Sequence, residues 1–100
     1  MITRIVKMTF QPHLVAEFLI IFERVREDIR NFPGCKHLEM LVWTENKAVI
    51  FTLSRWESVE KLDEYRSSQL FKETWKKTKS LFSAPAEAWS LIDDTTKVDK

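Results

Sequence analysis

The chain has few of the residues that would indicate disulfides, repeats or long loops. Its 100 residues include one cysteine, Cys35, one glycine, Gly34, and three prolines. A single cysteine excludes an intrachain disulfide and is typical of a reducing compartment, so we expect a cytoplasmic protein. The thiol has two interpretations, a small core side chain or a reactive nucleophile. Its place at the start of an apolar strand favours the core.

Neither sign of charge is in excess, and no apolar run is long. Sixteen basic and fifteen acidic side chains leave a formal charge of +1. This balance gives no electrostatic basis for binding nucleic acid or an anionic membrane. The longest apolar run falls well short of the roughly 20 residues of a membrane span, and the N-terminus does not resemble a signal peptide. We therefore expect neither a nucleic-acid partner nor a membrane partner.

Motifs for metal, phosphate and acyl-transfer chemistry are also missing. No Cys and His pair has metal-ligand spacing, no glycine-rich loop is present to hold phosphate, and there is no nucleophile elbow. We expect no metal site. The common enzyme motifs therefore leave the activity undefined, and other features must indicate it.

What the chain has in quantity is aromatic residues. Four tryptophans and seven phenylalanines, within a hydrophobic content of 44%, predict one compact domain with an aromatic core. We place this domain at residues 1–92. The polar residues 93–100 form a predicted C-terminal tail with frayed structure.

Apolar periodicity predicts the secondary structure. Residues 2–10 alternate as a strand, and Pro12 suits the start of a helix that continues to about Arg30. Gly34 then supplies a left-handed turn. The remaining predicted elements are strands over 35–44 and 48–55 joined as an antiparallel hairpin, a broken helix over 58–82, and a last strand over 87–92. In the first helix Leu19, Ile20 and Ile21 widen the apolar stripe, which indicates contact with a partner subunit.

The segment 49–82 carries the most information. A short strand rich in β-branched and aromatic residues passes through Trp56 into a helix that Ser58 caps. Ser67 and Ser68 predict a break and a second cap. The longer helix that follows places Phe71 and Trp75 on its apolar face and lysines on the other. We expect any pocket to open beside this segment.

The order βαββαβ predicts a ferredoxin-like sandwich of the α+β class, with four antiparallel strands and the helices on one side. Each strand nevertheless offers apolar residues to both faces, as Val49, Ile50 and Phe51 do in the third. A solvated face would show cleaner alternation. Burying several hundred Å² of such a face is worth on the order of 10 kcal/mol before association costs. We therefore predict a homodimer.

Three short motifs resemble one known family. Pro33-Gly34-Cys35, Trp56-Glu57-Ser58 and the segment from Tyr65 to Phe71 (YRSSQLF) are similar to those of antibiotic biosynthesis monooxygenase domains. The resemblance covers roughly residues 1–92 and implies a dimeric α+β barrel. The family includes cofactor-free monooxygenases acting on phenols or quinols, haem-degrading enzymes, signal-molecule processing enzymes and many members without an assigned function.

The haem-degrading branch can be compared position by position. The resemblance places Lys7, Tyr65 and Trp75 where that branch has asparagine, tryptophan and an iron-ligating histidine. An indole cannot coordinate iron, so haem breakdown is disfavoured. The resemblance instead implies a cofactor-free monooxygenase, in which the deprotonated substrate itself reduces dioxygen.

Six residues are the main candidates for that chemistry, with His13 as an alternative base. Trp56, Phe71 and Trp75 would bind a flat aromatic substrate by stacking. Tyr65 or Lys7 would donate a hydrogen bond to the substrate oxygen, Lys7 would stabilise the anion, and His37 or His13 would serve as the base.

Each candidate also has a structural interpretation. The tryptophans suit the core or a dimer interface, Tyr65 suits a capping hydrogen bond, and Lys7 and His37 suit solvent-exposed strand positions. The alternative function is accordingly a non-catalytic binding or structural module. RNA recognition is disfavoured, because the predicted third strand is apolar and lacks glycine.

Overall fold

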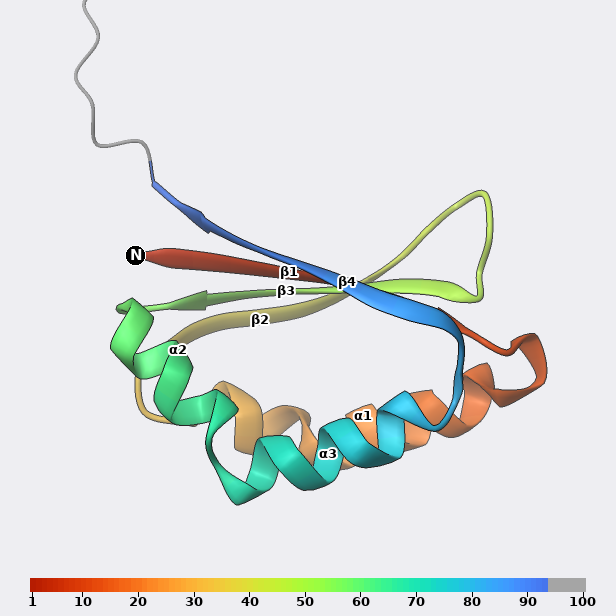
Figure 1. Ribbon diagram of the computed structural model, residues 1–100, viewed down its shortest axis with the longest axis horizontal. Coiled ribbons are helices and arrows are strands. Elements are labelled where there is room, and N and C mark those ends of the chain that lie inside the picture. Colours follow the sequence, from red (N-terminus) through yellow and green to blue (C-terminus); the bar gives the residue numbers. More distant parts are fainter. Residues whose placement is uncertain (94–100) are drawn as a thin grey trace, which may run out of the picture.

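The computed structural model describes residues 1–93, and Figure 1 shows a sheet with helices along one face. The elements are β1 (Ile2–Phe10), a 3-10 turn (Pro12–Leu14), α1 (Val15–Arg30), β2 (Cys35–Val42), β3 (Val49–Trp56), α2 (Val59–Arg66), α3 (Gln69–Lys79) and β4 (Phe82–Ile92). The predicted tail lies outside the described residues, apart from Asp93. None of the described helices is long and apolar enough to cross a membrane.

The four strands form one antiparallel sheet in the order β2-β3-β1-β4. β1 and β3 are central, and Ile2 pairs with Trp56 at one end of their ladder and Thr9 with Val49 at the other. The predicted ferredoxin-like βαββαβ arrangement and the β2–β3 hairpin are therefore confirmed. We call the face that carries the helices the inner face and the opposite face the outer face. Within residues 1–93, no segment covers the outer face (Figure 1).

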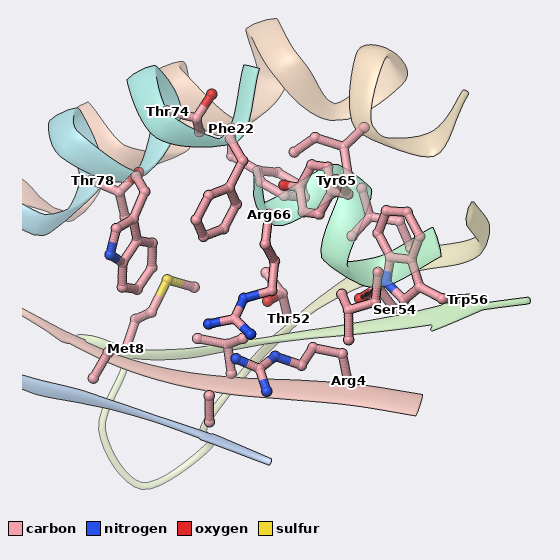
Figure 2. A pocket seen from close by; sticks show the side chains of 18 of the residues that line it. Arg4, Met8, Phe22, Thr52, Ser54, Trp56, Tyr65, Arg66, Thr74 and Thr78 are labelled. Carbon is pink, nitrogen blue, oxygen red and sulfur yellow. Dashed lines mark hydrogen bonds between the residues drawn. The ribbon is translucent and has the colours of Figure 1, made fainter. Parts of the chain in front are cut away.

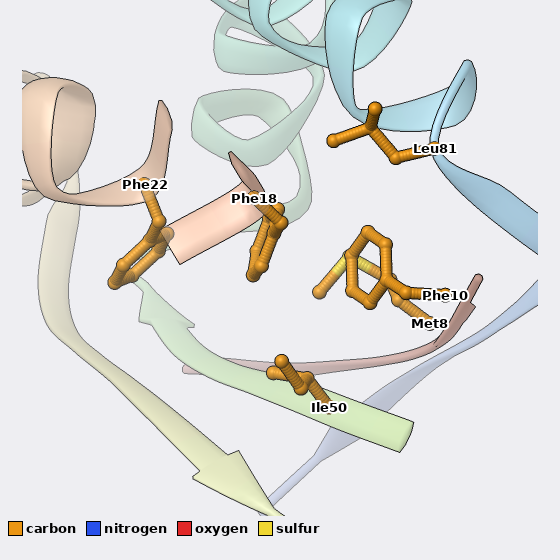
Figure 3. Close-up of a cluster of buried hydrophobic side chains, with 6 residues drawn as sticks. All are labelled: Met8, Phe10, Phe18, Phe22, Ile50 and Leu81. Carbon is orange, nitrogen blue, oxygen red and sulfur yellow. The ribbon is translucent and has the colours of Figure 1, made fainter. Parts of the chain in front are cut away.

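The core between sheet and helices is divided into two clusters. Figure 3 shows the larger cluster, in which side chains from β1, β3 and α1 meet Leu81 after α3. Its buried members are Met8, Phe10, Phe18, Phe22, Ile50 and Leu81. The smaller cluster lies under α2 and consists of Ile2, Cys35, Trp56 and Leu62. The two clusters share no residue, and neither fills the space between them.

The break between α2 and α3 falls at the predicted serines. The Ser58 hydroxyl accepts a hydrogen bond from the Lys61 amide at 3.2 Å at the start of α2. Ser68 does the same for the Phe71 amide at 3.1 Å at the start of α3, and its hydroxyl also donates to the Tyr65 carbonyl. These bonds satisfy amide groups that a helix start leaves unpaired. The side-chain hydrogen bonds of the two serines therefore stabilise the break between α2 and α3.

The apolar stripe of α1 is narrower than its sequence suggests. Phe18, Phe22 and Ile29 are buried, but Leu19 and Ile20 are 39% and 55% exposed. The prediction that this helix meets a partner subunit is not tested by a single chain. Because these two side chains are exposed, α1 offers an apolar surface in addition to the outer face of the sheet.

The last strand begins five residues earlier than predicted. β4 starts at Phe82, whereas the sequence indicated a helix to that residue and a strand only from Glu87. Pro85 suggested a loop because it cannot donate a ladder hydrogen bond. β4 is an edge strand, however, and its pairing with β1 shifts register between Lys7 and Thr9, opposite Pro85. An edge position beside a bulge accommodates the proline.

Cys35 occupies the core position that its sequence context favours. The side chain is buried in the smaller cluster, and burial raises the pKa of its thiol. A raised pKa reduces the fraction of thiolate, which is the reactive form. The structure therefore supports the core interpretation over the reactive one.

Replacing Gly34 with alanine should destabilise the fold by about 2 kcal/mol, because Gly34 has a φ of 92° that a Cβ atom makes unfavourable. A methyl group there would also lie 2.5 Å from Cβ of Lys61. We expect thermal unfolding of Gly34→Ala to show a Tm lower by roughly 10 °C. Lys47→Ala, a change in the exposed β2–β3 turn, is the control. Equal Tm values for the two variants would contradict this account of the turn.

Candidate functional site

A cavity of about 270 Å³ lies between the inner face of the sheet and the helices. Its lining comes from all four strands of the sheet on one side and from α1, α2 and α3 on the other (Figure 2). It occupies the space between the two core clusters, beside the α2–α3 break. Such a volume lies just under the usual range for small-molecule sites, about 300–1,000 Å³. The cavity therefore suits a compact ligand of a few fused rings.

Four aromatic residues in contact with one another form one wall of the cavity. Trp56 and Tyr65 stack with their ring centroids 4.8 Å apart, and Phe71 meets Tyr65 edge-on at 5.2 Å. Phe71 and Trp75 then lie nearly parallel, 5.9 Å apart at 11°. All four residues line the cavity. This aromatic wall presents ring faces and edges that favour a flat, apolar ligand.

Trp56 is the fixed end of the aromatic wall. Its side chain is fully buried, and its indole Nε1 donates a hydrogen bond to Ser54 Oγ at 2.9 Å. Because the one polar group of the indole is already paired, Trp56 can offer a ligand only its carbon surface. Trp75 is less buried and packs against the larger cluster while facing the cavity.

Tyr65 supplies a neutral hydrogen-bond donor at the aromatic wall. Its side chain leaves the last turn of α2, and its hydroxyl is directed into the cavity (Figure 2). Burial raises the pKa of this phenol well above its usual value near 10, with a smaller contribution from Cys35. The hydroxyl is thus protonated at neutral pH and available to donate to a ligand oxygen.

The opposite part of the cavity is basic, because Arg4 and Arg66 both line it. Arg4 reaches up from β1 and Arg66 down from the end of α2, and their guanidinium groups lie next to each other (Figure 2). Arg4 Nη1 donates to Ser90 Oγ at 2.9 Å. Burial, and then the charge of Arg66, lower the pKa of Arg4. We call these two residues the arginine pair.

The structure does not bring Lys7 or His37 to the cavity. Side chains alternate along a strand, so Lys7 points to the outer face while its neighbours Val6 and Met8 line the cavity. Lys7 Nζ lies 3.6 Å from Glu87 Oε2 and 6.0 Å from the centroid of the Trp43 ring.

His37 is likewise on the outer face, where its Nε2 lies 3.3 Å from Glu39 Oε1. Its neighbour Leu38 lines the cavity from the inner face. Four of the six predicted site residues, Trp56, Tyr65, Phe71 and Trp75, therefore share one cavity, and the other two lie across the sheet from it.

Acidic side chains and histidine are missing from the lining. Among the described residues, none of those that line the cavity is Asp, Glu or His, and no group of three potential metal ligands occurs. The polar lining consists of the arginine pair, Tyr65 and hydroxyl groups such as that of Ser54. The cavity can thus bind and polarise an anion, but its lining contains no carboxylate or imidazole to accept a proton.

A family model described as antibiotic biosynthesis monooxygenase matches residues 1–77. The chain belongs to this family. The matched range includes the three motifs that suggested it, and it contains the whole aromatic wall together with the arginine pair. No curated protein matches the chain at a significant level.

Solved structures with the same fold are numerous. A conserved protein from Methanosarcina mazei Go1 is 22% identical, with a TM-score of 0.86 over 90% of this chain and 89% of that one. A putative antibiotic biosynthesis monooxygenase from Caulobacter crescentus is 20% identical, with a TM-score of 0.85 over 96% and 90%. Another antibiotic biosynthesis monooxygenase is 14% identical, with a TM-score of 0.87 over 93% and 98%. At these identities the likeness shows the fold alone.

Tyr65 is the only tyrosine of the chain, so its ionisation can be followed without interference from others. A spectrophotometric titration at 295 nm should place its midpoint clearly above 10, because burial disfavours the phenolate. A raised folded-state pKa also means that the phenol's contribution to stability is intact below pH 10 and is lost as the pH rises further. Tyr65→Phe should lose less stability than the wild type over that range. A midpoint near 10 in the folded protein would contradict the buried position.

Proposed function

We propose that the chain is a cofactor-independent monooxygenase that oxidises a small phenolic or quinol-like compound in the cavity. The observation that carries this proposal is the cavity of about 270 Å³ in which four aromatic rings form one wall, with a neutral phenol donor among them. Membership of the monooxygenase family supports the reaction class.

The reaction needs no external reductant. A phenol with a free para position gives up four electrons to O₂: one oxygen atom becomes the new carbonyl of a quinone, and the other leaves as water. The two hydrogens of that water come from the hydroxyl and the para carbon of the phenol. The first step is loss of the phenolic proton, because the phenolate is the form that transfers electrons to O₂.

The residues of the cavity take distinct parts in this scheme. The aromatic wall holds the ring, and Tyr65 donates a hydrogen bond to the ligand oxygen on which negative charge develops. The positive potential of the arginine pair favours the phenolate over the phenol. Because none of the described residues that line the cavity carries a carboxylate or an imidazole, we propose that the proton leaves to solvent. The roles predicted for Lys7 and His37 do not enter, because both residues lie on the outer face.

The lack of a proton acceptor is also the observation that favours a second candidate, a non-catalytic module that binds the same aromatic compounds. General bases in enzymes lie within hydrogen-bond reach of the proton they remove. A binding module would show affinity for phenols without consumption of oxygen.

We also propose that the protein is a cytoplasmic homodimer joined through its outer faces. Leu41, Trp43, Trp89 and Leu91 are 43–49% exposed, and they come from β2, the turn after it and β4. Side-chain alternation puts Leu41, Trp89 and Leu91 on the outer face. Large apolar side chains gathered on one sheet face of a monomer are typical of a buried interface. The buried free thiol of Cys35 suits a reducing compartment.

Oxygen consumption tests the enzymatic proposal. With 1-naphthol as substrate, an oxygen electrode should record uptake above the uncatalysed rate, and ¹⁸O₂ should label the quinone product. Tyr65→Phe should lower kcat/KM about tenfold, because it removes one hydrogen bond to developing charge. Trp75→Ala should raise KM by loss of stacking. Lys72→Ala, on the exposed side of α3, is the control. If no phenol or quinol of a broad panel is oxidised, the enzymatic proposal is wrong.

Sedimentation velocity at micromolar concentration tests the dimer. Trp89→Glu would bury a charge in the proposed interface and should convert the dimer to a folded monomer. Ile20→Glu makes the same kind of change on the exposed surface of α1 and should leave the dimer intact. If Ile20→Glu dissociates the protein and Trp89→Glu does not, the interface lies on α1. A wild-type monomer would refute the dimer altogether.

A further inference from the structure

Within the part of the chain that the structure describes, the arginine pair has no acidic partner. Among residues 1–93, the ion pairs involve other cations, and neither Arg4 nor Arg66 is within 4.0 Å of a carboxylate oxygen. In the same range, the one side-chain hydrogen bond of the pair goes from Arg4 to the neutral hydroxyl of Ser90. Most guanidinium N–H groups of the pair are thus free to bind a ligand.

Arg4 is half-buried and Arg66 is exposed, and their two adjacent guanidinium groups repel each other. Their mutual influence appears in the lowered pKa of Arg4, to which burial and the charge of Arg66 both contribute. An anion bound between them would offset the repulsion and supply the acceptors that both groups lack. Arg66 is an exposed residue at the end of α2, and its side chain reaches toward the sheet (Figure 2). The cavity is therefore arranged for an anion.

We propose that the arginine pair binds a carboxylate carried by the aromatic ligand of the cavity. The inference rests on the proposed function for the place of the ring, which stacks on the aromatic wall, and it adds the chemical class of the ligand: an aromatic acid. One end of the cavity holds apolar carbon and the other holds positive charge, so a ligand with a flat ring and a single anionic group matches both ends.

A carboxylate suits this site better than a phosphate does. A carboxylate on an aromatic ring is flat and has two oxygens, which two forked guanidinium groups can fill with paired hydrogen bonds. A phosphate has three outer oxygens and two charges at neutral pH, and it needs further donors around it. Alanine side chains, Ala86 and Ala88, form the neighbouring wall on β4 and offer none.

Calorimetric titration of the purified full chain with matched compounds tests the proposal. The probes are 1-hydroxy-2-naphthoate, 1-naphthol and 1-naphthyl phosphate, which share a ring system and differ in the anionic group. We expect the carboxylate to bind at least tenfold more tightly than 1-naphthol. Its affinity should fall as NaCl is raised from 50 to 500 mM, since salt screens the interaction of charges.

Variants then assign the effect to the pair. Arg66→Met should abolish the preference for the carboxylate, so that 1-hydroxy-2-naphthoate and 1-naphthol bind with similar affinity. Arg66→Lys keeps the positive charge but lacks the forked N–H donors of a guanidinium group. It should therefore retain only part of the preference for the carboxylate. Arg24→Met removes an exposed arginine of α1 outside the cavity and should change neither value. Arg4→Met should act as Arg66→Met does, provided that its circular dichroism and Tm match the wild type.

The outcomes separate this inference from the proposed function. Equal affinities for 1-naphthol and the carboxylate, or a preference that survives Arg66→Met, would overturn the inference even if 1-naphthol is oxidised. Tighter binding of the phosphate would overturn the choice of carboxylate. Selective, arginine-dependent binding of the carboxylate without oxygen uptake would uphold the inference and refute the oxidation.

Discussion

The cavity depends on the break in the helical layer at Ser67 and Ser68. A continuous helix across this region would carry its apolar stripe straight along the sheet and join the two core clusters. Instead, α2 ends at Arg66, and the Ser68 hydroxyl accepts the Phe71 amide to begin α3. The unfilled space lies beside this point, and Tyr65 and Phe71 face it from the two sides of the break.

Much of the fold follows from local sequence signals. Alternation in β1, the Pro12 start and Gly34 turn around α1, and the two serine caps each have a direct physical cause, and all of them appear in the structure. The start of β4 does not follow in this way. Leu81 and Phe82 continue the helical spacing of α3, and Pro85 suggests a loop, so only the pairing of β4 with β1 reveals a strand from Phe82 onward.

Part of the candidate site also follows from the sequence, and part does not. Trp56, Tyr65, Phe71 and Trp75 lie at the cavity because a strand end and a capped helix break bring aromatic residues together over a short stretch of chain. The resemblance and side-chain chemistry indicate Lys7 and His37, but neither accounts for the face of the sheet on which these residues lie. Alternation from the apolar Val6 and Met8 assigns Lys7 to the outer face and Arg4 to the inner one. Arg66 could not be placed in this way, because its approach to Arg4 depends on how α2 packs over the sheet.

The four tryptophans fall into two sets with different surroundings. Trp56 and Trp75 line the cavity, whereas Trp43 and Trp89 are exposed, with Trp89 on the outer face of the sheet. A ligand in the cavity would alter the emission of the first set, and association through the outer face would shift the second set toward shorter wavelengths. The intrinsic fluorescence of this chain can therefore report occupancy and self-association as two separate optical signals.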